Sequence, residues 1–289
     1  MKSRTIRVPH GTGEVSLHYL EWGSAKAERV AVCVHGISRN AHDFRWLGDC
    51  LAEAGWRVLS FDMVGRGKSE WLADPKGYIV PVYVQHMVHA MSRLGLENVD
   101  WIGTSMGGLI GMGLAVSNAP LRSLVLNDVG PFISAGALAG IAAAVAHPPS
   151  LVSVAEVVGY LKGRFTPYGP VSDAQWQELA AGSVRKDADG TLRLHYDPAI
   201  SAPMEGITPA DVDLWGLYDR IKVPVMALRG AVSPILDQPT AEAMTHRGPH
   251  AMLFTFHNIT HPLWLADNEQ MHLVRDWLLG HPRGEDLPD

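Results

Sequence analysis

Short runs of apolar residues, separated by stretches with helical spacing, are the feature that most constrains how this chain can fold. The runs that predict strands are rich in β-branched and aliphatic residues and cover 14–22, 29–35, 56–62, 99–103, 122–128, 223–230 and 251–257. Most of them are continuously apolar, as expected for strands covered on both faces. Helical spacing is found at 42–55, 82–95 and 262–280. This alternation predicts an α/β fold, with a mainly parallel twisted sheet and helices on both of its faces.

The ends of the predicted elements add detail to this fold. Gly55 is a suitable C-terminal stop for the first helix, and Pro262 suits the first turn of the last helix. The first two predicted strands follow one another without a helix between them. We therefore expect these two strands to form an antiparallel pair at one edge of the sheet.

One region interrupts the alternation of strands and helices. No strand of the main sheet is predicted from residue 131 to about residue 209, and the sheet resumes at Val223. The region instead has small helical segments at 150–161 and 172–182 and a polar patch at 185–197. A chain of 289 residues is within the range of one α/β domain. We therefore predict a core domain made of residues 1–130 and 210–289, with a helical insertion at 131–209.

Composition and charge exclude several classes of protein. The net charge of −6 and the lack of a Lys/Arg cluster argue against a nucleic-acid partner. Two cysteines, Cys33 and Cys50, are too few for a disulfide framework and indicate buried thiols in a reducing compartment. The N-terminus has no apolar core typical of a secretory signal, and the stretch 136–146 is shorter than the roughly 20 residues that span a membrane. We therefore expect a cytoplasmic protein with no membrane partner; nothing in the sequence indicates its oligomeric state.

The segment Gly103-Thr104-Ser105-Met106-Gly107 is the strongest local signal for chemistry, because it lies where a predicted strand becomes a predicted helix. A serine nucleophile must be held clear of the sheet on a sharp turn, and flanking glycines allow neighbouring backbone to pass closely. A serine that only caps the following helix would also fit this position. The strand–turn–helix context favours Ser105 as a nucleophile.

A serine nucleophile needs a general base. His261 lies in a loop after the last predicted strand, whereas His257 ends that strand and His272 lies within the last helix. Because the base must approach the nucleophile from a loop above the sheet, we expect His261 to fill this role.

An acyl intermediate also needs N–H donors for its oxyanion. We expect these to be the backbone N–H groups of Met106, which follows the nucleophile, and of Ile37, in the loop after the strand 29–35. His35 begins this loop, and we expect it to hold the loop in place rather than to act as a base.

These motifs together resemble the α/β-hydrolase fold superfamily, and they occur in its order along essentially the whole chain. The resemblance is carried by HGIS at 35–38, FDMVGRGKS at 61–69, GTSMGG at 103–108 and NITHPLWL at 258–265. The second of these segments matches the D-x-x-G-x-G-x-S turn of the family at Asp62, Gly65, Gly67 and Ser69. The resemblance implies that the insertion 131–209 is a lid over the substrate pocket.

The chain departs from the family pattern at the acid that orients the base. In many members this acid follows the penultimate strand, where this chain has Ser233. Two aspartates are candidates for the role, Asp128 at the end of the strand 122–128 and Asp237 four residues after Ser233. Some relatives with a lid use the position of Asp128, so we favour Asp128 over Asp237. Asp128 as a simple turn residue is the alternative without chemistry.

The resemblance also limits the reaction. Epoxide hydrolases and haloalkane dehalogenases of this fold have Asp at the position of Ser105, whereas a serine implies an acyl-enzyme. We therefore predict hydrolysis of a carboxylic ester or lactone of a small to medium, partly apolar substrate. A C–C bond hydrolase acting on a ring-cleavage diketone, an acyltransferase and a non-catalytic binding protein of this fold are the alternatives.

Fewer residues can be assigned to the substrate pocket. Arg39 and Asn40 would serve a C–C hydrolase as polar pocket groups, but we expect them to be solvated loop residues. The aromatic residues of the insertion, together with Trp264, either line the pocket or pack in a core: Tyr160, Phe165, Tyr168 and Trp176. No cofactor is predicted, since no phosphate-binding glycine loop is present, and no metal site is predicted, since the histidines are scattered.

Overall fold

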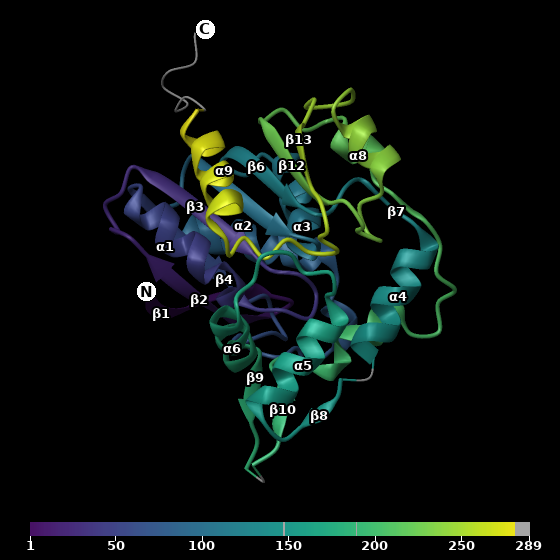
Figure 1. Cartoon of the computed structure of the whole chain (residues 1–289). Coiled ribbons are helices and arrows are strands. Elements are labelled where there is room, and N and C mark those ends of the chain that lie inside the picture. The colour runs from purple at the N-terminus through teal and green to yellow at the C-terminus, as the bar shows by residue number, and fades with distance from the viewer. Residues whose placement is uncertain (147, 189, 281–289) are drawn as a thin grey trace, which may run out of the picture.

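An eight-stranded sheet forms the centre of the computed structural model, which describes residues 1–146, 148–188 and 190–280 (Figure 1). The strands lie in the order β1-β2-β4-β3-β5-β6-β12-β13. Their bounds are β1 Lys2–His10, β2 Gly13–Trp22, β3 Arg29–Val34, β4 Trp56–Phe61, β5 Val99–Thr104, β6 Leu121–Asn127, β12 Val225–Gly230 and β13 Met252–Phe256. From β4 to β13 all neighbouring strands are parallel. The predicted fold class, a mainly parallel sheet with helices, is confirmed.

The prediction for the edge of the sheet was wrong. β2 and β3 are not neighbours: β2 pairs antiparallel with β4 and with β1, and β3 lies between β4 and β5. Val30 to Val34 are all buried, and a strand buried on both faces needs an inner position. The edge strand β1 was not predicted, because most of its residues are exposed and it has no apolar run.

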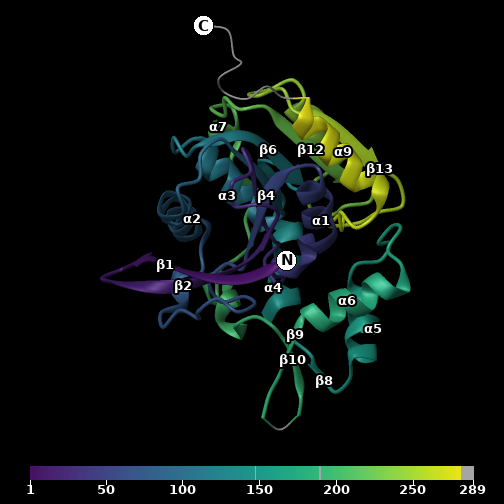
Figure 2. The ribbon, with the colours of Figure 1, turned by 90° about the vertical axis from the view of Figure 1, so that its left-hand side faces the viewer.

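Helices cover both faces of the sheet (Figure 2). α1 (Arg45–Glu53) and α9 (Asn268–Leu279) pack on one face, and α2 (Val80–Leu94) and α3 (Met106–Ala115) pack on the other. Along β3, Val32 and Val34 point to the α2–α3 side, whereas Ala31 and Cys33 point to the α1–α9 side. Both sets are buried, which explains why the strands are continuously apolar. Two shorter helices complete the core, α7 (Trp215–Tyr218) and α8 (Gln238–Met244).

The last helix begins later than predicted. α9 starts at Asn268, and the Asp267 side chain caps it by accepting a hydrogen bond from the Gln270 N–H at 3.1 Å. Pro262 is therefore not in its first turn. Residues 262–266 form a buried irregular segment instead, because the aspartate at 267 is the better N-cap.

The segment between β6 and β12 projects from the core (Figure 1). It contains the helices α4 (Ala135–Ala146), α5 (Val154–Arg164) and α6 (Asp173–Gly182). It also contains a small sheet of β8 (Ser150–Leu151), β10 (Leu192–Leu194) and β9 (Val184–Lys186), and a pair formed by β7 (Phe132–Ile133) and β11 (Val212–Asp213). The small sheet was not predicted, since its short polar strands resemble a loop. The β7–β11 pair joins the two ends of this segment. β11 lies three residues after the predicted end of the insertion at residue 209.

In the part of the chain that the structure describes, no helix has both the length and the apolar character needed to cross a membrane. The last nine residues of the predicted core domain, 281–289, lie outside the described residues.

Candidate active site

Ser105 occupies a sharp turn between β5 and α3. Its backbone has φ 52° and ψ −114°, a conformation that is strained for a residue with a side chain. Its hydroxyl does not cap α3, so the turn is not explained by capping alone. The Ser105 N–H donates to the Asn127 carbonyl at 3.0 Å, which fixes the turn against the end of β6. Ser105 therefore lies at the carboxyl edge of the parallel strands, on the kind of turn that exposes a nucleophile.

The glycines that flank Ser105 are required by close backbone contacts. A Cβ on Gly103 would lie 2.2 Å from the Gly107 carbonyl oxygen, and a Cβ on Gly107 would lie 2.0 Å from that of Val34. Both distances are far below van der Waals contact. The predicted reason for these glycines, that neighbouring backbone must pass closely, is confirmed.

Asp128 lies beside the Ser105 turn. The ladder between β5 and β6 pairs Thr104 with Asn127, so Ser105 and Asp128 directly follow paired residues. Asp128 is completely buried, has φ 55°, and accepts a hydrogen bond from the Gly230 N–H through Oδ1 at 2.9 Å. Its other carboxylate oxygen is therefore free to hold a partner at this edge of the sheet.

That partner is His261, in the loop after β13. His261 Nδ1 lies 2.8 Å from Asp128 Oδ2, and 17% of the His261 side chain is exposed. A proton on Nδ1 that is donated to the carboxylate leaves Nε2 as the ring nitrogen able to accept a proton. The structure thus joins the predicted base to the favoured acid, and it places that acid at the strand end next to the Ser105 turn.

The His261 loop is fixed from two sides. The Thr260 N–H donates to the Pro167 carbonyl at 2.7 Å. Ile259 forms a β-bridge with Tyr168 of the segment between β6 and β12, which we call the intervening segment. Behind the loop, the Asn127 side chain donates to the Leu263 carbonyl at 2.8 Å. These contacts determine where the imidazole lies relative to β6.

Among the described residues, His261 forms its ion pair with Asp128 and none with Asp237. Asp237 is exposed and caps α8, where its Oδ1 accepts a hydrogen bond from the Thr240 N–H at 2.7 Å. Ser233 is buried, and its Oγ accepts from the N–H groups of Ile235 and Leu236. Both residues therefore stabilise local turns after β12.

The other histidines named in the sequence do not approach Ser105 as a base. His257 and His272 are exposed. His35 is completely buried between the Gly36 carbonyl, 2.7 Å from Nδ1, and the Met63 N–H, which donates to Nε2 at 3.1 Å. Burial lowers the pKa of His35 to about 4, so this ring is neutral at pH 7. His35 joins the loop after β3 to the turn after β4, as expected.

The two predicted oxyanion donors belong to the residue after Ser105 and to a loop that passes beside Ser105. Met106 begins α3, where the first N–H groups have no partner within the helix and favour negative charge. Ile37 follows Gly36, and a Cβ on Gly36 would be 3.6 Å from the Ser105 Cβ. The loop after β3 therefore passes directly beside the Ser105 side chain.

Arg66 holds both of these residues and was not identified from the sequence. Its Nε donates to the Ile37 carbonyl at 2.8 Å, and its Nη2 lies 3.7 Å from the Met106 sulfur. The Arg66 side chain is only 1% exposed and also donates to the Tyr83 hydroxyl. In the sequence, the one indication that Arg66 has a role is its position inside the glycine turn of residues 61–69. This position does not reveal which distant loops the side chain contacts.

The glycine turn itself is built around a buried carboxylate. Asp62 accepts hydrogen bonds from the His18 ring and from the N–H groups of Ala41 and Lys68, at 2.7 to 2.9 Å. Burial acts to raise the pKa of Asp62, but these hydrogen bonds outweigh it and lower the pKa below the ordinary value. A Cβ on Gly67 would overlap this carboxylate at 2.1 Å. The turn is therefore structural, as the family resemblance implies.

Arg39 and Asn40 are buried, so the prediction that they are solvated was wrong. Arg39 pairs with Asp43 and donates to the Ser183 hydroxyl at 2.8 Å, and Asn40 donates to the Gly182 carbonyl at 2.7 Å. These contacts fasten the loop after β3 to the end of α6. They could not be predicted locally, because α6 is far away in the sequence.

A cavity of about 360 Å³ opens beside His261, and we call it the α4 cavity. Its lining residues come from α4, the end of α5 and the loops after β12 and β13: Gly136, Ala137, Gly140, Ile141, Ala144, Arg164, Phe165, Pro234, Ile235, Thr260 and His261. Of the aromatic residues considered from the sequence, Phe165 lines this cavity. Trp176 and Trp264 pack against each other with ring centroids 5.3 Å apart, behind Phe165.

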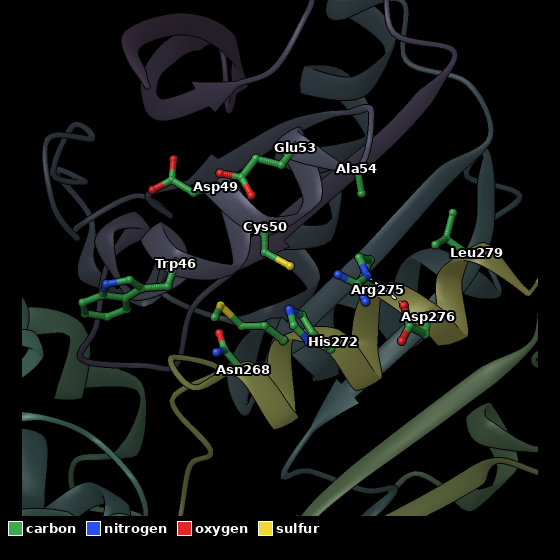
Figure 3. Close-up of a pocket in the computed structure, with 11 residues that line it drawn as sticks. Trp46, Asp49, Cys50, Glu53, Ala54, Asn268, His272, Arg275, Asp276 and Leu279 are labelled. Carbon is green, nitrogen blue, oxygen red and sulfur yellow. Dashed lines mark hydrogen bonds and ion pairs between the residues drawn. The ribbon is translucent and has the colours of Figure 1, made fainter.

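A larger surface cavity of about 550 Å³ lies elsewhere, between α1 and α9 (Figure 3). Asp49, Cys50 and Glu53 of α1 face His272 and Arg275 of α9 across it. None of the residues expected to take part in chemistry lines this cavity. Burial raises the pKa of the Cys50 thiol, which disfavours its reactive thiolate form.

Among the described residues, no group of three or more His, Cys, Asp or Glu side chains is arranged to hold a metal ion.

Comparison with known proteins shows the fold family of the chain. The family model for the alpha/beta hydrolase fold matches residues 30–146. A 3-hydroxybutyrate-oligomer hydrolase of Cupriavidus necator is 38% identical over 94% of this chain and 95% of its own length. The solved structure of an alpha/beta hydrolase from Novosphingobium aromaticivorans has a TM-score of 0.84 and 31% identity, covering 96% of this chain and 98% of that one. A Rickettsia typhi protein superimposes with a TM-score of 0.91 at 29% identity, over 96% and 99% of the two chains.

Proposed function

Because this chain belongs to the α/β-hydrolase fold family, we propose that it is a serine hydrolase that cleaves a carboxylic ester through an acyl-enzyme on Ser105. The observation that carries the proposal is the hydrogen bond between His261 and the buried Asp128, at the same strand ends as the strained Ser105 turn. Such a bond holds an imidazole in the tautomer that can accept a proton from a serine hydroxyl.

The proposed reaction begins when His261 Nε2 takes the proton of the Ser105 hydroxyl as its oxygen attacks the ester carbonyl. The negative charge that develops on the carbonyl oxygen is stabilised by the N–H groups of Ile37 and Met106. His261 then gives the proton to the leaving alcohol, and Asp128 stabilises the imidazolium during this transfer. His261 then takes a proton from a water molecule as that water attacks the acyl-enzyme. It gives this proton to the Ser105 oxygen, which leaves as the acid is released.

The α4 cavity is proposed as the site for part of the substrate. It contacts His261, and its wall is mostly apolar, which suits a small to medium, partly apolar ester. We propose that residues 131–209 act as a lid, since α4 and α5 supply much of this wall. Oligomers of 3-hydroxybutyrate, the substrate named for the Cupriavidus necator relative, are the first natural esters to test, and a lactone of similar size is a second class.

The decisive measurement is ester hydrolysis by the wild type and by Ser105→Ala. We expect wild-type protein to hydrolyse p-nitrophenyl butyrate and 3-hydroxybutyrate oligomers, and Ser105→Ala to lose roughly 10⁴-fold or more in kcat/KM. Ser92→Ala, at an exposed position of α2, is the matched control and should keep wild-type activity.

Failure of this test would point to the alternatives. A wild type that cleaves a ring-cleavage diketone but no ester would replace the proposal with a C–C hydrolase. No turnover of any ester, lactone or diketone, together with measurable binding of one of them, would favour a non-catalytic binding protein. The ion pair of Arg39 with Asp43 argues against the C–C hydrolase, because that guanidinium is not free to bind a substrate carboxylate.

A further inference from the structure

The α4 cavity contains one guanidinium in an otherwise largely apolar wall. Among the described residues that line it, Arg164 carries the one permanent charge. The same cavity is also lined by His261, so a ligand held by Arg164 would lie in the cavity that borders the proposed base. The position of Arg164 therefore bears on which ester is cleaved, provided that the proposed function is correct.

Most N–H donors of the Arg164 guanidinium are not used by the contacts described for it. Arg164 Nη1 donates to the Ala144 carbonyl at 3.2 Å, and the guanidinium lies 5.5 Å from the Phe165 ring centroid. These two contacts fix the direction of the side chain but do not neutralise its charge. Within the described part of the chain, no Asp or Glu forms an ion pair with Arg164. A guanidinium has five N–H donors, so most of them are available to a ligand.

Two other cations of the same segment are held in ion pairs. Lys162 forms an ion pair with Asp173 at 2.7 Å, and Arg193 forms one with Asp187 at 2.6 Å. These pairs are on the exposed side of the segment, where water also solvates the charges. Arg164 is half-buried at the cavity, and no ion pair of this kind is found for it among the described residues. At a half-buried position, solvent screens the attraction between a guanidinium and a negative charge less than at an exposed one.

We infer that Arg164 binds a free carboxylate of the substrate, so that the preferred esters carry this carboxylate on the part held in the α4 cavity. The planar guanidinium matches a carboxylate through two parallel hydrogen bonds. Space for the linking carbons is available, because the α4 cavity has a volume of about 360 Å³. The carboxylate belongs either to the acyl half or to the alcohol half of the ester.

The test compares pairs of esters that differ only in whether the carboxylate is free or methylated. For the acyl half, the pair is mono-p-nitrophenyl glutarate and its methyl ester, followed by release of p-nitrophenol. For the alcohol half, the pair is 3-acetoxybutyrate and its methyl ester, followed by release of acetate. The quantity measured is the ratio of kcat/KM for the free acid to that for the methyl ester, which cancels a general loss of activity.

We expect the wild type to prefer the free acid in one of the two pairs, and that pair identifies the half that enters the cavity. Arg164→Gln should reduce the ratio by about 10- to 100-fold, mainly through KM, as expected for the loss of a charge-assisted hydrogen bond. Arg164→Lys should restore part of the preference, since it keeps the charge but not the planar fork. Arg193→Gln removes an equal charge from the same segment and should leave the ratio unchanged.

The inference is overturned if the wild type shows no preference for the free acid in either pair, or if Arg164→Gln leaves the ratio within twofold of the wild type. Either result, obtained while the wild type hydrolyses the neutral esters and Ser105→Ala does not, rejects only the carboxylate site. Absence of hydrolysis of all four esters by the wild type would instead reject the proposed function on which this inference rests.

Discussion

Two residues with positive φ stand side by side at the proposed site. Ser105 at 52° and Asp128 at 55° follow adjacent parallel strands, and neither is a glycine. Such conformations cost free energy and persist only where the surrounding structure enforces them. Here the Ser105 N–H is bonded to Asn127, and the Asp128 N–H donates to the Leu228 carbonyl at 2.8 Å. The two strained turns therefore lie next to each other at the carboxyl edge of the sheet.

The residue-scale prediction concerns the choice of acid. Asp128→Asn should lower kcat for ester hydrolysis by roughly 10³- to 10⁴-fold, because a neutral amide no longer holds the His261 tautomer or stabilises its cation. Steady-state kinetics on p-nitrophenyl butyrate would measure this loss, and circular dichroism would check that the variant is folded.

Asp237→Asn is the matched control for that prediction. Asp237 caps α8, and asparagine is an equally good N-cap, so both activity and stability should stay close to those of the wild type. Large loss of kcat in Asp237→Asn with little loss in Asp128→Asn would contradict the assignment of the acid.

At the scale of elements, the contact between α2 and β1 contains a pair of histidines, of which His86 is buried. His86 of α2 is 1% exposed, and its Nε2 lies 3.1 Å from Nδ1 of His10 in β1. Burial, followed by the charge on His10, lowers the pKa of His86 to about 4. The folded protein therefore keeps this ring neutral under conditions in which the unfolded chain protonates it.

This burial makes stability depend on pH. The unfolded pKa of histidine is about 6.5, so the contribution of His86 is fully present above pH 6.5 and is lost as the pH falls toward 4. Between pH 7 and pH 5, His86 should account for roughly 1 to 2 kcal/mol of the decrease in unfolding free energy. His86→Leu should remove this part of the pH dependence, as measured by urea unfolding at both pH values.

Comparing each variant with itself at the two pH values separates the titration from the packing effect of leucine. His272→Leu, at an exposed position of α9, is the control and should keep the wild-type difference. An equal difference in His86→Leu and wild type would show that His86 does not contribute to the acid sensitivity.

At the scale of the whole molecule, the intervening segment is joined to the core by hydrogen bonds at several distant points. Besides the contacts of Arg39 and Asn40, the Gly67 N–H donates to the His195 carbonyl and the Asp197 N–H donates to the Gly65 carbonyl, both at 2.8 Å. The Tyr78 hydroxyl donates to the Asp197 carboxylate at 2.6 Å and accepts from the Leu72 N–H at 2.8 Å. The segment and the glycine turn therefore form one hydrogen-bonded unit.

Removal of the Tyr78 hydroxyl should loosen this unit. Tyr78→Phe leaves the Leu72 N–H and one Asp197 oxygen without their buried partner, at a cost of about 1 to 3 kcal/mol. We expect amide hydrogen exchange at Asp197 and Ile200 to become at least about tenfold faster, with β5 little changed, because local opening then costs less than global unfolding.

Tyr160→Phe provides the comparison for this experiment. Tyr160 is half-buried in α5, and its hydroxyl has no hydrogen-bond partner among the described residues, so its removal should not alter exchange at Asp197. Unchanged exchange at Asp197 in Tyr78→Phe would show that this hydroxyl does not hold the segment to the core.

The sequence alone was sufficient for the features that depend on local pattern. Continuous apolar runs indicated strands buried on both faces, and the predicted α/β-hydrolase fold, the family and the hydrolase class are confirmed. The glycines beside Ser105 were explained correctly, because a tight turn imposes its requirement on adjacent residues. Local pattern also placed His261 in a loop between the last strand and the last helix, which is where the structure has it.

Tertiary structure decided what depends on contacts between distant segments. The order of β2, β4 and β3, the hydrogen bond from His261 to Asp128 rather than Asp237, and the burial of Arg39 all join residues far apart in the chain. The contacts of Arg66 with Ile37 and of Arg164 with Ala144 likewise join separate loops and helices. The physical reason is that residue spacing records how each segment is buried, whereas the choice of partner depends on long-range packing that no single segment encodes.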